Sequence, residues 1–446
     1  MPAKPHARLP QPIFHEPIFN EDQPLPSPTG FETKHDNDDA TYAAVEKLLK
    51  KDVVPAPKSR AADDALFTLE QAYGSNHGPL VTKKIQQAKK IIFHAIGDSG
   101  ASDSHKYVND ELRVCDQVTM DSTGADDANR PAFLFHLGDV VYNFGESRYY
   151  YDQFYDAFRN YPAPIFAIPG NHDSFIVPGT ADDEKPLTIF QRNFCSPQPV
   201  ITPEAGSLHR TAMTQPGVYF ALDAPYVRII ALFSNALEDP GVISSEGKKW
   251  PTVGNYQLDF LSAQLNRIKK ENYKGCVLLA VHHPPYSYSP EPKKGKGGNH
   301  GSSPAMLKQI DEICLKAGVY PHAVLSAHAH NYQRYSRTFE FGGRQIDVPF
   351  IVCGDGGHNV NLLVRKGPEP YPTSRVDYLE SKDAAIKAKE LWLEKYNDSQ
   401  YGYLRVHVDE KELAISFHQV GATRTIAQSR YDMVTINLAD RKMVTN

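Results

Sequence analysis

Five short blocks of the sequence place carboxylate, amide, phenol and imidazole groups directly after runs of apolar residues. The blocks are Gly97-Asp98-Ser99-Gly100, Gly138-Asp139-Val140-Val141-Tyr142, Gly170-Asn171-His172-Asp173, His282-His283-Pro284 and His328-Ala329-His330. Carboxylate oxygens, amide oxygens and imidazole nitrogens are ligands that hard and borderline metal ions prefer. Open α/β sheets form their ligand sites outside the carboxyl ends of the strands. The blocks therefore predict a metal site at which several strand ends meet.

The candidate ligands suit a pair of metal ions. They are Asp98, Asp139, Tyr142, Asn171, His282, His328 and His330. Two cations about 3.5–4 Å apart form a clamp for phosphoryl chemistry. One carboxylate has to bridge such a pair, because a shared anion offsets the repulsion between the two ions. This pattern predicts metal-assisted hydrolysis of a phosphate ester.

Apolar runs alternate with amphipathic segments and predict a layered α/β domain that begins near residue 89. The predicted strands cover residues 91–96, 132–137, 164–169, 276–281, 323–326 and 348–353, with hairpins over 217–222 and 227–233 and over 403–408 and 413–418. The predicted helices cover residues 105–120, 150–158, 256–270, 303–316 and 381–396. Ser303 is a plausible cap for the fourth of these helices, and Pro304 suits its first turn.

The chain divides into three predicted parts. Residues 1–88 form an N-terminal extension, residues 89–426 form the catalytic domain, and residues 427–446 form a C-terminal tail. Within the extension, an arm over residues 1–40 is expected to wrap the domain, and short helices are expected over 42–51 and 63–73. The extension is interpreted as structural rather than as a separate functional module.

Composition limits the partners and the compartment. The net charge of -5 argues against nucleic acid as the main partner. The five cysteines lack C-x-x-C spacing, so no disulfide framework or thiolate zinc site is expected. No apolar run reaches the ~18 residues of a membrane span. No signal peptide is visible, which indicates a cytoplasmic protein or a mature form with the signal removed. The sequence leaves the oligomeric state open.

The five blocks resemble those of the calcineurin-like metallophosphoesterases, and specifically those of the purple acid phosphatases. That family carries GDxG, GDxxY, GNH[ED], a strand ending in His, and GHxH, and the blocks here follow that order over roughly residues 89–420. The resemblance implies an α/β (α+β) fold, a four-layer αββα sandwich with the metals at the carboxyl ends of the strands. Ala327 departs from the pattern, since a Gly usually precedes the last His-x-His. This change is expected to affect backbone freedom rather than ligation.

Tyr142 makes the resemblance more specific. Many other metallophosphoesterases begin with Asp-x-His and use that His as a ligand, but position 100 here is Gly. Tyr142 stands where purple acid phosphatases place a phenolate, a hard anionic donor that suits Fe(III). The resemblance implies that Asp98, Asp139, Tyr142 and His330 hold Fe(III), and that Asp139, Asn171, His282 and His328 hold a divalent ion, either Fe, Zn or Mn. The alternative is that Tyr142 only packs in the core.

Three further residues are interpreted as catalytic. His172 resembles the family's substrate-facing His, which could bind phosphate oxygens or protonate the leaving alkoxide. Asp173 would hold the tautomer of His172. His300, in Asn299-His300-Gly301, lies where related phosphatases carry another outer-sphere His, and a solvated surface position is the alternative. His283 is interpreted as part of a structural turn rather than as a ligand.

The resemblance implies a dinuclear-metal hydrolase of phosphate monoesters that acts on a phosphorylated small molecule. A metal-bound hydroxide would attack phosphorus in line with the leaving oxygen. A phosphodiesterase of the same superfamily, with Mn or Zn in both sites and Tyr142 outside the coordination shell, is the nearest alternative. A metal-binding scaffold without turnover is an alternative from another class. The basic run over residues 293–296 either steers anionic substrates or is a solvated loop.

Overall fold

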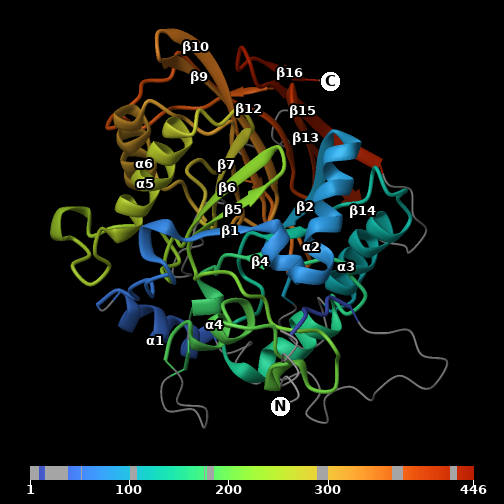
Figure 1. The fold of residues 1–446 in the computed structure, drawn as a ribbon. Coiled ribbons are helices and arrows are strands. Elements are labelled where there is room, and N and C mark those ends of the chain that lie inside the picture. The colour runs from blue at the N-terminus through green and yellow to red at the C-terminus, as the bar shows by residue number, and fades with distance from the viewer. Residues whose placement is uncertain are drawn as a thin grey trace, which may run out of the picture.

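Two stacked β-sheets with helices on both outer faces make up the protein (Figure 1). The computed structural model describes residues 10–15, 39–51, 53–100, 108–174, 176–177, 185–288, 300–363, 375–421 and 429–445. Aromatic side chains join the sheets: the rings of Phe135 and Phe220 lie 6.1 Å apart, as do those of Phe67 and Phe166. The predicted four-layer αββα arrangement is therefore confirmed.

The first sheet has nine strands, several of which end at the same edge. In spatial order they are β1 (Leu66–Thr68), β5 (Phe220–Ala224), β6 (Val227–Leu232), β7 (Cys276–Val281), β8 (Ala323–Ser326), β10 (Arg344–Cys353), β9 (Tyr332–Phe341), β12 (Glu390–Asn397) and β11 (Val376–Asp377). β6, β7, β8 and β10 run parallel to one another. Their carboxyl ends therefore lie side by side. The predicted strands over 276–281 and 323–326 and the β5–β6 hairpin are confirmed.

The second sheet has seven strands and contributes three more parallel strand ends. Its order is β16 (Met443–Thr445), β15 (Ser429–Asn437), β14 (Glu412–Val420), β13 (Tyr401–Asp409), β2 (Lys90–Ile96), β3 (Leu134–His136) and β4 (Ile165–Ala167). β2, β3 and β4 are parallel and almost wholly buried. Strands covered on both faces read as continuous apolar runs, which is why the sequence located them.

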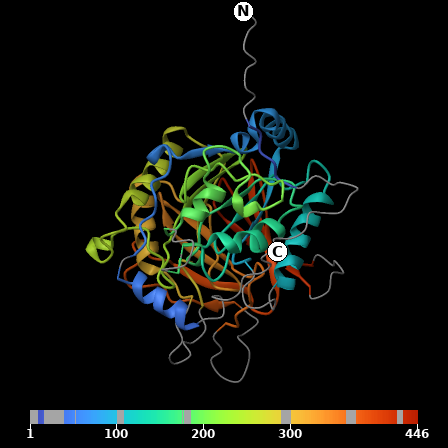
Figure 2. The ribbon, with the colours of Figure 1, turned by 90° about the horizontal axis from the view of Figure 1, so that it is seen from below.

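Helices cover the outer faces, and an irregular segment crosses one end. The α-helices are α1 (Asp39–Leu49), α2 (Leu69–Ala88), α3 (Val108–Thr123), α4 (Thr188–Phe194), α5 (Tyr256–Lys270) and α6 (Pro304–Ala317). Short 3-10 turns occur at Ala62–Asp64, Ser147–Tyr149, His172–Ser174, Pro203–Ala205 and Glu246–Lys248, and a π-helix spans Tyr151–Asp156. α5 and α6 lie on one side and α2 and α3 on the other (Figure 1). Seen from below, the described residues 185–219, which include α4, lie across the sandwich (Figure 2).

The predicted helix over 63–73 is wrong in its first half. Leu66–Thr68 form β1, which pairs in parallel with β5, and α2 begins only at Leu69. Thr68 closes a capping box with Gln71, and this box fixes the start of α2. The apolar spacing is helical from Leu69 onward, but the pairing partner of β1 lies some 150 residues away and leaves no local signal.

The predicted helix over 381–396 is also wrong. Glu390–Asn397 form β12, which pairs antiparallel with β9. Leu391 and Leu393 are buried, whereas Trp392 between them is not. This alternation has the period of a strand. The segment is charged and rich in helix formers, so its local preference is overridden by pairing with β9.

The expected extension and the expected tail both contribute strands to the sheets. β1 lies within residues 1–88, and β15 and β16 lie within residues 427–446. Of the expected arm over 1–40, the described part includes Ile13, which exchanges hydrogen bonds with Thr211. The exact domain boundaries stay a prediction, and the basic run over 293–296 lies outside the described residues. No helix in the described part of the chain is long and apolar enough to cross a membrane.

Asp121 ties α3 to the second sheet. Its carboxylate accepts a 2.7 Å hydrogen bond from Nε2 of His94 on β2 and pairs with Arg405 on β13. Nδ1 of His94 faces the Tyr161 hydroxyl at 3.1 Å, so a neutral ring protonated on Nε2 serves both partners. Burial raises the pKa of Asp121, but the His94 hydrogen bond and the Arg405 charge outweigh burial and lower the pKa to about 2.

Asp121→Asn is expected to lower the free energy of unfolding at pH 7 by about 1–2 kcal/mol, allowing for solvent screening. The folded-state pKa lies below the unfolded value of 3.8. The contribution is therefore present above about pH 4 and is lost as the pH falls toward 2. Urea unfolding of the wild type and of Asp121→Asn at pH 7 and pH 3 measures this difference in free energy. Asp127→Asn, which removes an exposed pair with Lys84, is the control, and equal losses from both variants would contradict the assignment.

Candidate active site

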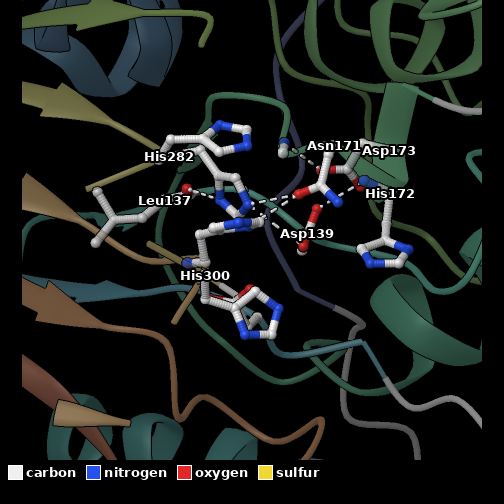
Figure 3. A network of polar contacts seen from close by, with 12 residues as sticks. Leu137, Asp139, Asn171, His172, Asp173, His282 and His300 are labelled. Carbon is white, nitrogen blue, oxygen red and sulfur yellow. Dashed lines mark hydrogen bonds and ion pairs between the residues drawn. The ribbon is translucent and has the colours of Figure 1, made fainter. Parts of the chain in front are cut away.

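Strand ends from both sheets deliver the seven candidate ligands to one buried place. Figure 3 shows three of them, Asp139, Asn171 and His282, close together. Asp98, Asp139 and Asn171 follow β2, β3 and β4 of the second sheet, whereas His282 and His328 follow β7 and β8 of the first. Each of the seven candidate ligands is at most 5% exposed. The site thus lies between the sheets, where the sequence predicted that strand ends would meet.

Three of these residues have a strained backbone conformation, and Gly170 allows two of the turns to approach closely. The φ angles of Asp98, Asp139 and His328 are 54°, 55° and 66°, in the left-handed region that residues other than Gly seldom adopt. Such outliers gather at functional sites, where the surrounding structure enforces them. Gly170 has to be Gly, because a Cβ there would lie 2.0 Å from Oδ1 of Asp139.

One group of ligands surrounds the hydroxyl of Tyr142. The Tyr142 oxygen lies 2.9 Å from Asp98 Oδ1, 2.9 Å from Asp139 Oδ2 and 3.2 Å from His330 Nε2. Tyr142 is fully buried, and its ring stacks on that of His358 with centroids 3.6 Å apart. The hydroxyl therefore points at the carboxylates rather than at the apolar core.

A second group of ligands adjoins the first through Asp139. Nε2 of His282 lies 3.3 Å from Asp139 Oδ2 and 3.1 Å from Asn171 Oδ1. Nδ1 of His328 lies 3.1 Å from the same amide oxygen. Ligand atoms of Asp139, His282 and His328 all fall within 4.8 Å of one another. The structure thus brings all seven predicted ligands into two adjoining groups, with Asp139 in contact with both.

Burial disfavours ionisation of the acidic groups around Tyr142, namely its own hydroxyl and the carboxylates of Asp98 and Asp139. Burial first, and then the Asp139 and Asp98 carboxylates, raise the pKa of Tyr142. Burial likewise raises the pKa of Asp98. Burial also opposes ionisation of Asp139, but the charge of His282 outweighs it and holds the pKa of Asp139 below its usual range. Positive charge close to Tyr142 and Asp98 would favour the ionised forms of both groups.

The histidines fit the same interpretation. Burial lowers the pKa of His328 and of His330, so both rings are neutral, as metal ligands must be. Burial lowers the pKa of His282 too, but the Asp139 carboxylate outweighs it and raises the pKa to about 9. Nε2 of His328 is buried with no hydrogen-bond partner among the described residues. Converging oxygen and nitrogen donors of this kind fit the binding of metal.

Asp173 does not act on His172 as the sequence suggested. Nδ1 of His172 faces the backbone carbonyl of Asn143 at 2.8 Å, and that carbonyl sets the tautomer. The Asp173 carboxylate instead accepts backbone N–H groups of Gly170 at 2.8 Å and of Val140 at 3.0 Å, together with that of Val141. Asp173 therefore fixes the two turns that carry Asp139 and Asn171.

His300 lies in the site and not on a solvated surface. Its side chain is 14% exposed, and Nε2 lies 3.3 Å from Oε1 of Glu238. The His300 ring lies 4.7 Å from that of His328 and 4.9 Å from that of His330, measured between centroids. The structure therefore places His300 beside two of the predicted ligands, and its outer-sphere role stays a prediction. His283, by contrast, bonds Ser234 and the Leu237 carbonyl, as a turn residue would.

Sequence reasoning missed two residues of the site, Glu238 and His358. They follow β6 and β10, the two parallel strands that flank β7 and β8 in the first sheet. His358 stacks on Tyr142, and its Nδ1 faces the Gly100 carbonyl at 3.0 Å. The order of the strands in the sheet would have located both residues, because neighbouring parallel strands end at the same edge. The sequence does not show this order.

Comparison with known proteins assigns the family. The model of the calcineurin-like phosphoesterase family matches residues 95–332, more than half of the chain, and the chain belongs to this family. It is 24% identical over 266 residues to a protein of Arabidopsis thaliana named probable purple acid phosphatase 20. The match covers 60% of this chain and 52% of that relative, so the chain aligns with about half of the relative's length.

Two solved structures align with most of the chain at low similarity. One is GAP50, described as the anchor in the inner membrane complex of Plasmodium, with 12% identity, a TM-score of 0.46 and coverage of 79% of this chain and 90% of that one. The other is PhoD, with 12% identity, a TM-score of 0.45 and coverage of 80% and 71%. At these scores neither structure informs the function. Family membership and the Asp–His cluster support a metal-dependent phosphoesterase.

Gly170→Ala is expected to remove bound metal while leaving the protein folded. The new methyl group would displace the Asp139 carboxylate, which contacts both ligand groups. We expect metal content after dialysis to fall by at least half, as measured by elemental analysis. Gly301→Ala is the matched control, because its nearest atom would be Asp239 Oδ1 at 3.9 Å. Full metal occupancy in Gly170→Ala would show that Asp139 is not a ligand.

Proposed function

We propose that the chain hydrolyses phosphate monoesters at a dinuclear metal centre of the purple acid phosphatase type. The observation that carries the proposal is the buried Tyr142 hydroxyl, which lies within 3.2 Å of Asp98, Asp139 and His330. A tyrosine that only packed would not need two carboxylates around its hydroxyl, because burying such a cluster is unfavourable. A trivalent cation would offset the charge of a phenolate and two carboxylates.

The residues divide between two proposed ion sites. Asp98, Asp139, Tyr142 and His330 would hold Fe(III), and Asp139, Asn171, His282 and His328 would hold a divalent Fe, Zn or Mn ion. Bound ions of this kind neutralise phosphate charge and lower the pKa of water. The purple acid phosphatase relative supports this assignment only at 24% identity. The contacts around Tyr142 support it independently.

His172 and His300 would act on the substrate from outside the ligand set. The Asn143 carbonyl holds Nδ1 of His172, and Nε2 of the protonated ring would donate a proton to the leaving oxygen. Glu238 faces Nε2 of His300, which leaves Nδ1 as the nitrogen able to contact a phosphate oxygen. Both rings lie beside the proposed ligands. The ring centroids of His172 and Tyr142 are 4.3 Å apart, and those of His300 and His328 are 4.7 Å apart. A phosphorylated small molecule is the proposed substrate.

Visible absorption of the purified protein tests the Tyr142 assignment. A phenolate bound to Fe(III) gives a charge-transfer band, so we expect a violet or pink protein with about two metal ions per chain. Tyr142→Phe is expected to abolish the band. Tyr155→Phe is the control, because that buried hydroxyl bonds Asn193 and Thr202 instead. A metal-replete protein that is colourless and free of iron would favour the Mn or Zn phosphodiesterase.

Substrate comparison tests the reaction class and the role of His172. We expect p-nitrophenyl phosphate to be hydrolysed faster than bis-p-nitrophenyl phosphate. His172→Ala is expected to lower kcat about 10²-fold for an alkyl phosphate and much less for p-nitrophenyl phosphate, whose leaving group needs no proton. His77→Ala, at an exposed position of α2, is the control. Equal losses on both esters would exclude His172 as the acid, and hydrolysis of diesters alone would exclude the monoesterase.

A further inference from the structure

Glu238 reaches the proposed divalent site from the end of β6. Its carboxylate is only 10% exposed and contacts two residues of the site at once. Oε2 accepts a hydrogen bond from Nδ2 of Asn171 at 3.2 Å, and Oε1 lies 3.3 Å from Nε2 of His300. The neighbouring Asp239 accepts the backbone N–H of Gly301 at 3.0 Å. The dipeptide Glu238-Asp239 therefore holds both an amide of the site and the backbone next to His300, just before α6.

The contact with Glu238 decides which end of the Asn171 amide faces the ligands. Asn171 Oδ1 lies 3.1 Å from His282 Nε2 and 3.1 Å from His328 Nδ1. An amide nitrogen carries two hydrogens and no lone pair for a metal, so only the oxygen can serve as a ligand. A carboxylate accepts hydrogen bonds and cannot donate them. Glu238 therefore favours the orientation in which nitrogen faces outward and oxygen faces His282 and His328.

We propose that Glu238 is a positioning residue that keeps the Asn171 amide oxygen turned toward the divalent ion and holds His300 beside it. The inference rests on the proposed dinuclear centre. It assigns a role to a residue that no motif of the sequence marks. The hydrogen bonds of a ligand's outer neighbours orient the ligand, and losing them commonly weakens metal affinity about 10–100-fold.

Metal affinity tests the proposal without any substrate. Apo-protein is titrated with Zn²⁺ and with Mn²⁺ against a competing chelator, and the affinity of the weaker site is measured. Glu238→Ala is expected to weaken this site about 10–100-fold. Glu246→Ala is the matched control: Glu246 follows the same strand, its side chain is 9% exposed, and it pairs with Lys249. Wild-type affinity in Glu238→Ala would overturn the proposal.

A second substitution separates orientation of the amide from a general loss of structure. In Asn171→Asp an oxygen faces the ion whichever way the side chain turns, so Glu238 is no longer needed to choose the orientation. The double variant Asn171→Asp/Glu238→Ala is therefore expected to bind the weaker ion at least tenfold more tightly than Glu238→Ala alone. With Glu238 present, Asn171→Asp would place two carboxylates side by side, and this single variant is expected to bind the weaker ion no more tightly than the wild type. A double variant no better than Glu238→Ala would overturn the proposal.

Folding and function are checked separately. Thermal unfolding of the apo-proteins shows whether Glu238→Ala folds, and Glu238→Gln replaces it if it does not. Glutamine has one acceptor oxygen for the two donors, Asn171 and His300. Glu238→Gln is therefore expected to lose less metal affinity, about threefold to tenfold. If the wild type binds only one ion, Glu238 has no divalent ion to support and the inference fails. If two ions bind but no monoester is hydrolysed, the monoesterase fails while the role of Glu238 is still decided by the affinities.

Discussion

The close approach of buried acidic groups around the Tyr142 hydroxyl is the constraint on which the rest of the site depends. Asp98 and Asp139 both contact that hydroxyl at 2.9 Å, and all three side chains are excluded from solvent. Such a cluster cannot carry its full charge in a low dielectric without positive partners. Burial raises the pKa of Tyr142 and of Asp98, and the Asp139 carboxylate outweighs burial to raise the pKa of His282 to about 9. Cations at the same place would lower these pKa values, which would couple metal binding to pH.

The sandwich keeps this cluster assembled although its members are far apart in the chain. Parallel strands of both sheets end at one edge, so Asp98 and Asp139 come from the second sheet and His282 and His328 from the first. This packing enforces the left-handed φ angles of Asp98, Asp139 and His328. The Asp173 carboxylate adds a local tie, since its three backbone N–H partners lie in the turns after β3 and β4.

An outer layer of side chains surrounds the proposed ligands and differs between the two ends of the site. Beside Tyr142 lies the neutral ring of His358, whose pKa burial lowers to about 3. Beside Asn171 lies the carboxylate of Glu238. A neutral ring would suit the proposed trivalent ion, whose candidate ligands already include two carboxylates and a phenol. The Glu238 carboxylate lies beside the proposed divalent site, where most of the candidate ligands are neutral.

Local sequence patterns were enough to predict the family-level fold, most of the buried strands and the seven candidate ligands that the structure brings together. A fully buried strand is a continuous apolar run, and the blocks that hold the candidates come after such runs. Residues 66–68 and 390–397, by contrast, form strands only because they pair with segments that are distant in the chain. The tertiary structure also decided the places of Glu238, His300 and His358 and the actual contacts of Asp173. These depend on which strands are neighbours in the sheet, and strand order is set by packing over the whole domain rather than by local sequence.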